Sequence, residues 1–207
     1  MAIDQRKRQK RLAKQVAKRK EKTKKLTAKS QSSSQGIPTG FVSSSPIYEC
    51  LMPENIFEMG IGNIIISRRK PNGNIAIGVF LVDVYCLGVK DAFFAVLSLD
   101  KYLELKIRFG EKGKLVSIDP PYARKFIEDA VSYALDLGFV PNKEYKHASM
   151  IFGNIDPKQC TETFTFGRDN KPCFVSGPND SPFKCKQIMD MLKRRCGEGN
   201  FDFIIMA

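Results

Sequence analysis

Residues 75–94 (IAIGVFLVDVYCLGVKDAFF) form the longest nearly unbroken apolar stretch of this 207-residue chain. Up to Val89 the stretch is rich in Val, Ile, Leu, Phe and Tyr, and both of its alternating faces are apolar. This pattern is typical of a strand that is covered on both sides. We therefore expect a central strand over residues 75–89. Asp83 is the exception within it, because a buried carboxylate must pair with a cation, accept hydrogen bonds or take up a proton.

A turn signal lies just before this central strand. Asn72-Gly73 separates two β-rich runs, residues 61–69 and 75–89, which favours an antiparallel hairpin. If the turn is centred on Asn72-Gly73, the numbers of paired residues sum to about 145, so that Gly62 lies opposite Asp83. Gly62 has no side chain, so this register leaves room beside Asp83 for a ligand, a water or another side chain.

The rest of the chain alternates between helical periodicity and short β-rich runs. We predict helices at residues 99–110, 120–137, 143–152 and 182–196, strands at 47–52 and 201–206, and a second hairpin formed by 162–166 and 172–176. No regular alternation of strand and helix is present, so the pattern favours an α+β domain over residues 46–207. We expect a central antiparallel sheet built from two hairpins, with three to four packed helices.

The positive charge of the chain is concentrated at its N-terminus. Residues 1–29 hold 13 Lys and Arg against two Asp and Glu, a charge of +11, whereas the formal charge of the whole chain is +12. Because this segment has no apolar face to bury, it predicts a disordered basic tail, followed by a flexible Ser/Gly-rich linker over residues 30–45. Such a tail can bind phosphates, improve solubility or act as a targeting signal, and we favour phosphate binding.

These features predict a binding protein whose partner is nucleic acid. RNA or a ribonucleoprotein is favoured over specific DNA, because the sequence has no helix-turn-helix or zinc-finger signature. The predicted nucleic-acid-binding residues are basic side chains of the tail and of the first hairpin: Arg6, Lys7, Arg8, Lys10, Arg11, Lys14, Lys18, Arg19, Lys20, Arg68 and Arg69. Aromatic side chains such as Phe164 and Phe166 could stack on bases, although core packing is the default for them.

An enzyme is the main alternative. Asp83, Lys90 and Asp91 are candidate catalytic residues, because carboxylates bind Mg²⁺ and a lysine stabilises charge on phosphate. Their spacing matches no nuclease signature. The alternative is therefore stated only as a class: a metal-dependent enzyme that acts on nucleic acid or nucleotide and whose cofactor is unknown. A protein-interaction adaptor, with a protein as its partner, is a third hypothesis.

The sequence gives little sign of a metal site or a reactive thiol. The six cysteines form no C-x-x-C pair, and the chain has one histidine, His147. Lysines flank Cys185 near a predicted helix start, which would lower the pKa of a thiol, but Cys185 also lies on the apolar face of that helix, which favours core packing.

Hydropathy predicts no contact with a membrane. No segment approaches the roughly 18 apolar residues of a membrane span, and no apolar run follows the basic N-terminus as in a secretory signal. We expect a cytoplasmic protein, with a nuclear or mitochondrial address left open.

Overall fold

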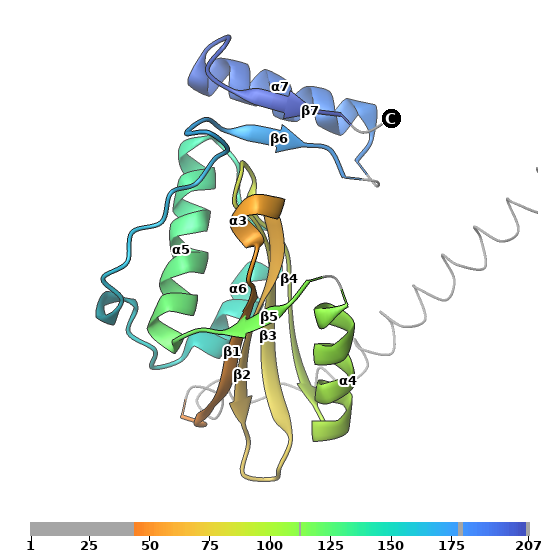
Figure 1. Ribbon diagram of the computed structural model, residues 1–207, viewed down its shortest axis with the longest axis vertical. Coiled ribbons are helices and arrows are strands. Elements are labelled where there is room, and N and C mark those ends of the chain that lie inside the picture. Colours follow the sequence, from red (N-terminus) through yellow and green to blue (C-terminus); the bar gives the residue numbers. More distant parts are fainter. Residues whose placement is uncertain (1–43, 112, 178–179, 206–207) are drawn as a thin grey trace, which may run out of the picture. The chain divides into compact units, whose positions relative to one another are not determined.

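A five-stranded antiparallel sheet with the strand order β4-β3-β2-β1-β5 lies at the centre of the fold (Figure 1). The computed structural model describes residues 44–111, 113–177 and 180–205. The strands of the sheet are β1 (Ile47–Pro53), β2 (Ile61–Arg69), β3 (Ile75–Asp83), β4 (Gly88–Leu97) and β5 (Leu115–Ser117). Helices pack on both faces, so the predicted α+β class with a central antiparallel sheet is confirmed.

The two faces of the sheet are covered by different helices (Figure 1). One face carries α4 (Leu99–Gly110), and its core includes Leu51, Ile65, Ile75, Ile77, Val79 and Tyr102. The other face carries α5 (Pro120–Asp136), α6 (Tyr145–Ala148) and the 3₁₀ helix η1 (Ser149–Phe152). Two short elements, α3 (Ile56–Met59) and η2 (Pro157–Gln159), lie within connections.

The helix predicted over residues 120–137 is α5, and its observed end differs from the predicted one by one residue.

The predicted central strand over residues 75–89 is wrong in its length, because the chain turns between β3 and β4. The Asp83 carboxylate accepts hydrogen bonds from the backbone N–H groups of Tyr85 (3.0 Å) and Cys86 (2.9 Å). An aspartate that binds the amides two and three residues ahead closes a turn. Gly88 then opens β4 with a φ of 60°, a conformation that glycine adopts without steric cost.

The predicted hairpin of β2 and β3 is present, but its register differs by one residue. Ile61 pairs with Asp83 and Gly62 pairs with Val82, so the expected space beside Asp83 opposite a glycine does not exist. The reason is the turn, in which the N–H of Lys70 donates to the carbonyl of Asn74 at 2.8 Å. The turn is therefore centred on Asn72 rather than between Asn72 and Gly73, and one residue of slip sends every side chain to the other face.

The predicted second hairpin is wrong. Residues 162–166 form no strand, and β6 (Cys173–Val175) instead pairs in parallel with β7 (Asp202–Ile204) across α7 (Pro182–Cys196). Phe164 and Phe166 pack against aromatic side chains of α5, with ring centroids 4.9 Å from Tyr122 and 5.4 Å from Tyr133. Burial of these two rings on a helix thus replaces the edge pairing that their alternation had indicated.

A second core joins β6 and α7 to the end of the main sheet. Its buried side chains are Cys86, Leu87, Leu137, Phe174, Cys185, Ile188 and Leu192. Cys185 thus lies in an apolar core, as its position on α7 had indicated. None of the described helices combines the length and the apolar character needed to cross a bilayer.

Candidate functional site

A hollow of about 360 Å³ lies between α5 and the α6–η1 segment. Its lining residues come from α5 (Arg124, Glu128), α6 (Tyr145), η1 (Ser149, Met150, Phe152) and the glycine that follows, Gly153. We call this feature the α5–η1 hollow. Its volume falls in the range of small-molecule sites, and it combines aromatic walls with a cation, a carboxylate and two hydroxyl groups.

Gly78 of β3 allows η1 to lie close to the sheet beneath the hollow. A Cβ atom added at Gly78 would fall 2.5 Å from Ile151 Cγ2 and 3.0 Å from the carbonyl oxygen of Ala148. Any side chain at this position would therefore push the α6–η1 segment away from β3. The missing side chain of Gly78 thus helps to set the position of one wall of the hollow.

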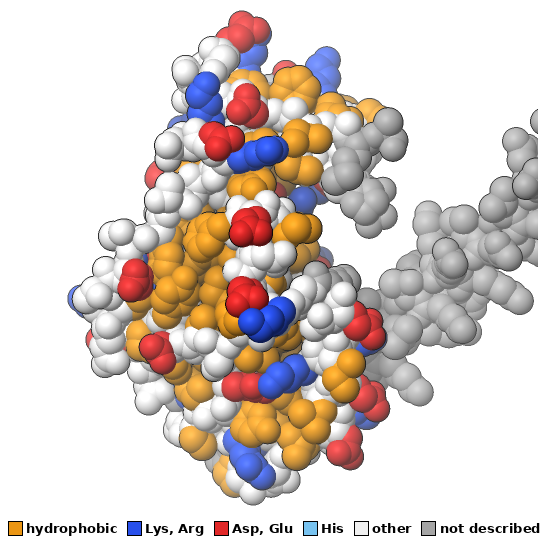
Figure 2. Space-filling model, in the orientation of Figure 1, with side chains coloured by type: hydrophobic (Ala, Val, Ile, Leu, Met, Phe, Trp, Pro, Cys, Tyr) orange, Lys and Arg blue, Asp and Glu red, His pale blue; other side chains and the backbone are white. Residues whose placement is uncertain are grey.

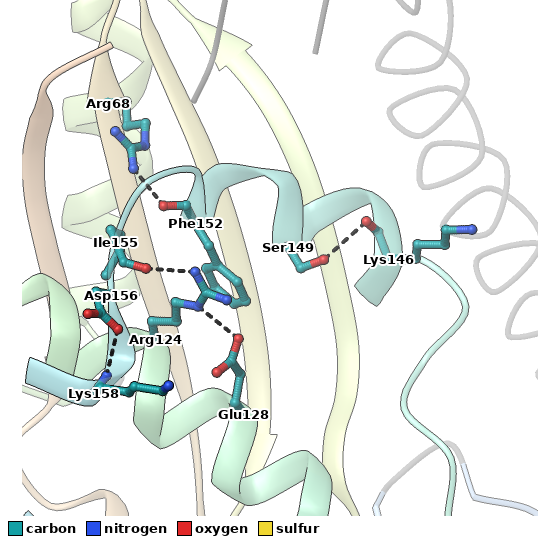
Figure 3. A network of polar contacts seen from close by, with 9 residues as sticks. All are labelled: Arg68, Arg124, Glu128, Lys146, Ser149, Phe152, Ile155, Asp156 and Lys158. Carbon is teal, nitrogen blue, oxygen red and sulfur yellow. Dashed lines mark hydrogen bonds and ion pairs between the residues drawn. The ribbon is translucent and has the colours of Figure 1, made fainter. Parts of the chain in front are cut away.

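Arg68 of β2 holds the same segment from the side of the sheet (Figure 3). The side chain is 1 % exposed, and its Nε and Nη2 atoms each donate at 2.7 Å to carbonyls at the end of η1, those of Ile151 and Phe152. Its Nη1 donates to the carbonyl of Ser45 at 2.5 Å, and Nη2 also reaches Asn154 Oδ1 at 3.2 Å. All three guanidinium nitrogens are therefore used inside the protein.

Arg124, on α5, lines the hollow on the side opposite the α6–η1 segment (Figure 3). Its guanidinium is less enclosed than that of Arg68. Its Nε donates to Glu128 Oε1 at 2.8 Å, and its Nη1 donates to the carbonyl of Ile155 at 2.6 Å. The guanidinium lies over the ring of Phe152, 5.4 Å from the centroid, and that ring stacks in turn on Phe80 at 5.4 Å. Two hydrogen bonds and a cation–π contact thus fix the plane of the guanidinium.

Two polar atoms of this pair are left without a protein partner among the described residues: Arg124 Nη2 and Glu128 Oε2. Both side chains are partly exposed, at 26 % for Arg124 and 35 % for Glu128. The α5–η1 hollow therefore presents a donor beside an acceptor, on side chains whose positions are already fixed.

Two hydroxyl groups complete the polar lining. Burial raises the pKa of the Tyr145 phenol, the nearby charge of Glu128 raises it further, and Arg124 partly opposes both effects. The phenol therefore stays protonated at neutral pH and can donate a hydrogen bond. The Ser149 hydroxyl donates to the carbonyl of Lys146 at 3.1 Å, so its oxygen remains available as an acceptor.

The three predicted catalytic residues do not converge. Asp83 is 5 % exposed, and its carboxylate is used in the turn between β3 and β4. Lys90 is the extra residue of a β-bulge, opposite the step from Leu81 to Val82, and its charge acts on Asp83. Asp91, by contrast, is exposed and accepts a hydrogen bond from the N–H of Ala92 at 2.9 Å. The structure therefore brings Lys90 to Asp83 but leaves Asp91 apart.

The environment of Asp83 favours its protonated form. Burial raises the pKa of its carboxyl to about 6, against the opposing effects of Lys90 and the backbone amides. Of the alternatives expected for a buried carboxylate at this position, the structure shows hydrogen bonding, from the backbone N–H groups of Tyr85 and Cys86. A search of residues 44–111, 113–177 and 180–205 gives no group of three His, Cys, Asp or Glu side chains that could hold a metal ion.

The predicted nucleic-acid-binding residues have separate outcomes. The nine of them in residues 6–20 lie outside the described part of the chain. Arg68 is not available to a phosphate, because its guanidinium is buried and bound to internal carbonyls. Arg69, one residue further, points the other way and is exposed.

Sequence reasoning missed the α5–η1 hollow. The sequence pattern of α5 assigns no role to Arg124 or Glu128, which are partly exposed in the structure. The spacing of four residues between a cation and a carboxylate was a visible signal, although it also occurs in ordinary surface pairs such as Lys125–Asp129 on the same helix. The two pairs differ in the structure because Arg124 and Glu128 line the hollow beside η1, whereas Lys125 and Asp129 do not.

Comparisons with models of known families, with curated proteins and with solved structures gave no match in any of the three.

Proposed function

We propose that the protein binds RNA, with its basic N-terminal tail (residues 1–29) supplying most of the affinity. The observation that carries this proposal is the separation of charge along the chain. The tail has 13 basic and two acidic side chains, a charge of +11 within the total of +12. Lysines and arginines that neutralise phosphates release condensed counterions, and this release drives sequence-independent binding of nucleic acids.

The charges of the folded part of the chain are arranged differently from those of the tail. On the face drawn in Figure 2, basic and acidic side chains are interspersed, and neither sign forms a continuous patch. Several lysines are also paired with carboxylates, as in Lys106–Glu49 at 2.7 Å and Lys184–Asp180 at 2.8 Å. A polyanion therefore finds a much higher density of charge on the tail than on this surface.

RNA is the favoured nucleic acid for two reasons. The sequence has no helix-turn-helix or zinc-finger signature, so sequence-specific reading of a DNA groove has no candidate element. Single-stranded RNA, in contrast, offers phosphates to a basic tail and unstacked bases to a folded domain. The domain would then supply a second contact with the RNA, in addition to that of the tail.

Full-length variants test this proposal. In one variant, the 13 lysines and arginines of residues 1–29 are replaced by glutamine; in a matched control, the same residues are kept but their order is scrambled. We expect the glutamine variant to bind a single-stranded RNA of about 20 nucleotides roughly 100-fold more weakly at about 0.1 M salt, because the counterion term is lost. The scrambled control should bind like the natural chain. Equal affinity of the glutamine variant and the natural chain would refute the proposal.

A further inference from the structure

We propose that the α5–η1 hollow binds a nucleobase whose edge is hydrogen-bonded by Arg124 and Glu128. The inference rests on the proposed function for its choice of ligand class. The hollow, the fixed guanidinium and the carboxylate are properties of the folded domain and do not involve the tail.

Arg124 is held in place but keeps one donor unused. Its guanidinium carbon lies 5.4 Å from the centroid of the Phe152 ring, Nε donates to Glu128 Oε1, and Nη1 donates to the carbonyl of Ile155. The nitrogen that remains available to a ligand is Nη2. The Phe152 ring, which also stacks on Phe80, places an aromatic wall of the hollow beside this donor.

The charges of the site favour a neutral ligand. Glu128 lies 2.8 Å from Arg124, so the pair is neutral overall and its carboxylate would repel a phosphate. A neutral ligand with a donor next to an acceptor fits this pair better than an anion does. The edges of nucleobases offer this arrangement, and their flat faces suit the aromatic lining of the hollow, Tyr145 and Phe152.

Guanine fits the Arg124–Glu128 pair best among the bases. Its Watson–Crick edge places the O6 acceptor beside two donors, N1–H and N2–H, so that O6 can face Arg124 Nη2 while the donors face the Glu128 carboxylate. The hollow of about 360 Å³ is large enough for a base with its sugar. The Tyr145 phenol and the Ser149 hydroxyl, both in the lining, are available for the ribose.

The test uses the full-length protein and mononucleotides at about 0.5 M salt, where contacts between the tail and phosphates are weak. Calorimetric titration with GMP, AMP, CMP and UMP should show binding that is tightest for GMP. Replacing Glu128 with glutamine should weaken GMP binding about tenfold or more, because the acceptor for two N–H groups is lost. Arg124→Lys should have a similar effect, because a lysine keeps the charge but lacks the rigid fork of N–H donors that holds Nη2 beside the carboxylate.

Asp129→Asn is the matched control. Asp129 pairs with Lys125 at 2.6 Å on the same helix, also with a spacing of four residues, and Lys125 lies 4.9 Å from the ring of Phe164. Only the Arg124–Glu128 pair borders the hollow, so Asp129→Asn should bind GMP like the natural chain. Thermal unfolding of each variant checks that the fold is kept.

The outcomes separate this proposal from the proposed function. GMP binding that survives neutralisation of the tail and is lost in Glu128→Gln supports the hollow. If no mononucleotide binds at concentrations up to about 5 mM, or if Asp129→Asn weakens GMP as much as Glu128→Gln does, the hollow is refuted, whatever the tail does. A single-stranded RNA with guanines, compared with one without, shows whether the base comes from RNA or from a free nucleotide.

Discussion

Arg68 and Arg124 contact the same short segment, residues 151–155, from two sides, and they differ in what they leave available. Arg68 is buried and donates from all three of its guanidinium nitrogens to protein acceptors. Arg124 donates from two nitrogens, lies over the ring of Phe152, lines the hollow and keeps Nη2 unused. The two acids, Asp83 and Glu128, differ in the same way. Residue type and charge alone do not distinguish a charged side chain with a structural role from one that can bind a ligand. Unused hydrogen-bonding groups beside a cavity do distinguish them.

The largest effect should come from Arg68→Met. This change keeps an apolar stem but leaves the carbonyls of Ile151 and Phe152 without their donors, at a cost of about 1–3 kcal/mol for each buried acceptor. We expect the free energy of unfolding in urea to fall by about 3 kcal/mol or more. Arg69→Met, on an exposed side chain, should change it by less than about 0.5 kcal/mol. Similar losses in the two variants would remove the distinction between the buried and the exposed arginine.

Asp83→Asn should change how stability depends on pH. The folded carboxyl, with its pKa raised to about 6, binds a proton more tightly than the unfolded one, so its contribution to stability is complete below about pH 4 and decreases as pH rises to about 6. The decrease is about 1.4 kcal/mol per pH unit, or about 3 kcal/mol in all. Asparagine can still accept the two turn hydrogen bonds but does not ionise. Relative to the natural chain, the variant should therefore gain about 3 kcal/mol between pH 4 and pH 7.

Urea unfolding at several pH values measures this effect, and Asp91→Asn serves as the exposed control. A constant difference between Asp83→Asn and the natural chain from pH 4 to pH 7 would contradict it. If Asp83 is a structural acid, its variant should also bind RNA and GMP like the natural chain.

Gly78→Ala tests whether the sheet sets the wall of the hollow. The added methyl would fall 2.5 Å from Ile151 Cγ2, and we expect a loss of about 1–3 kcal/mol in the free energy of unfolding. Gly110→Ala is the control, because a Cβ there meets nothing within 4 Å. If Gly78→Ala is as stable as Gly110→Ala, the close approach of η1 to β3 does not matter for stability.

The smallest effect on stability should come from Glu128→Gln. Its ion pair with Arg124 is partly exposed, and exposed pairs with this spacing contribute about 0.3–0.5 kcal/mol. Asp129→Asn should cost a similar amount, so the two variants should unfold at nearly the same urea concentration. A loss above about 2 kcal/mol in Glu128→Gln alone would show that the Arg124–Glu128 pair is structural, like Arg68.

The sequence predicted the elements that have strong periodicity and clear ends. The helix at residues 120–137 and the hairpin around Asn72-Gly73 both follow from local patterns, an apolar stripe in one and a turn signal in the other. The end of β3 could not be predicted in this way, because Asp83 is one polar residue within an apolar run and no local pattern marks it as the first residue of a turn. The parallel pairing of β6 with β7, and the packing of Phe164 and Phe166 on α5, are contacts between distant parts of the chain, which no local pattern contains.

The candidate site was the part least accessible from the sequence. Arg68 and Arg69 are neighbours of the same type, yet the alternation of β2 buries one and exposes the other, so a one-residue difference in register decides their roles. The pairing of Arg124 with Glu128 was visible at a spacing of four residues. The hollow beside it arises from a 3₁₀ turn, η1, which is positioned by Gly78 and Arg68 from distant parts of the chain.

The salt dependence of RNA affinity in the full-length protein tests the central claim most directly. If about six of the 13 basic side chains in residues 1–29 contact phosphates, the logarithm of the association constant should fall with the logarithm of salt concentration with a slope of about −4. The chain with a glutamine-substituted tail should show a slope near zero. A slope near zero in the natural chain, or an equally steep slope in both proteins, would contradict the claim that the tail carries the binding.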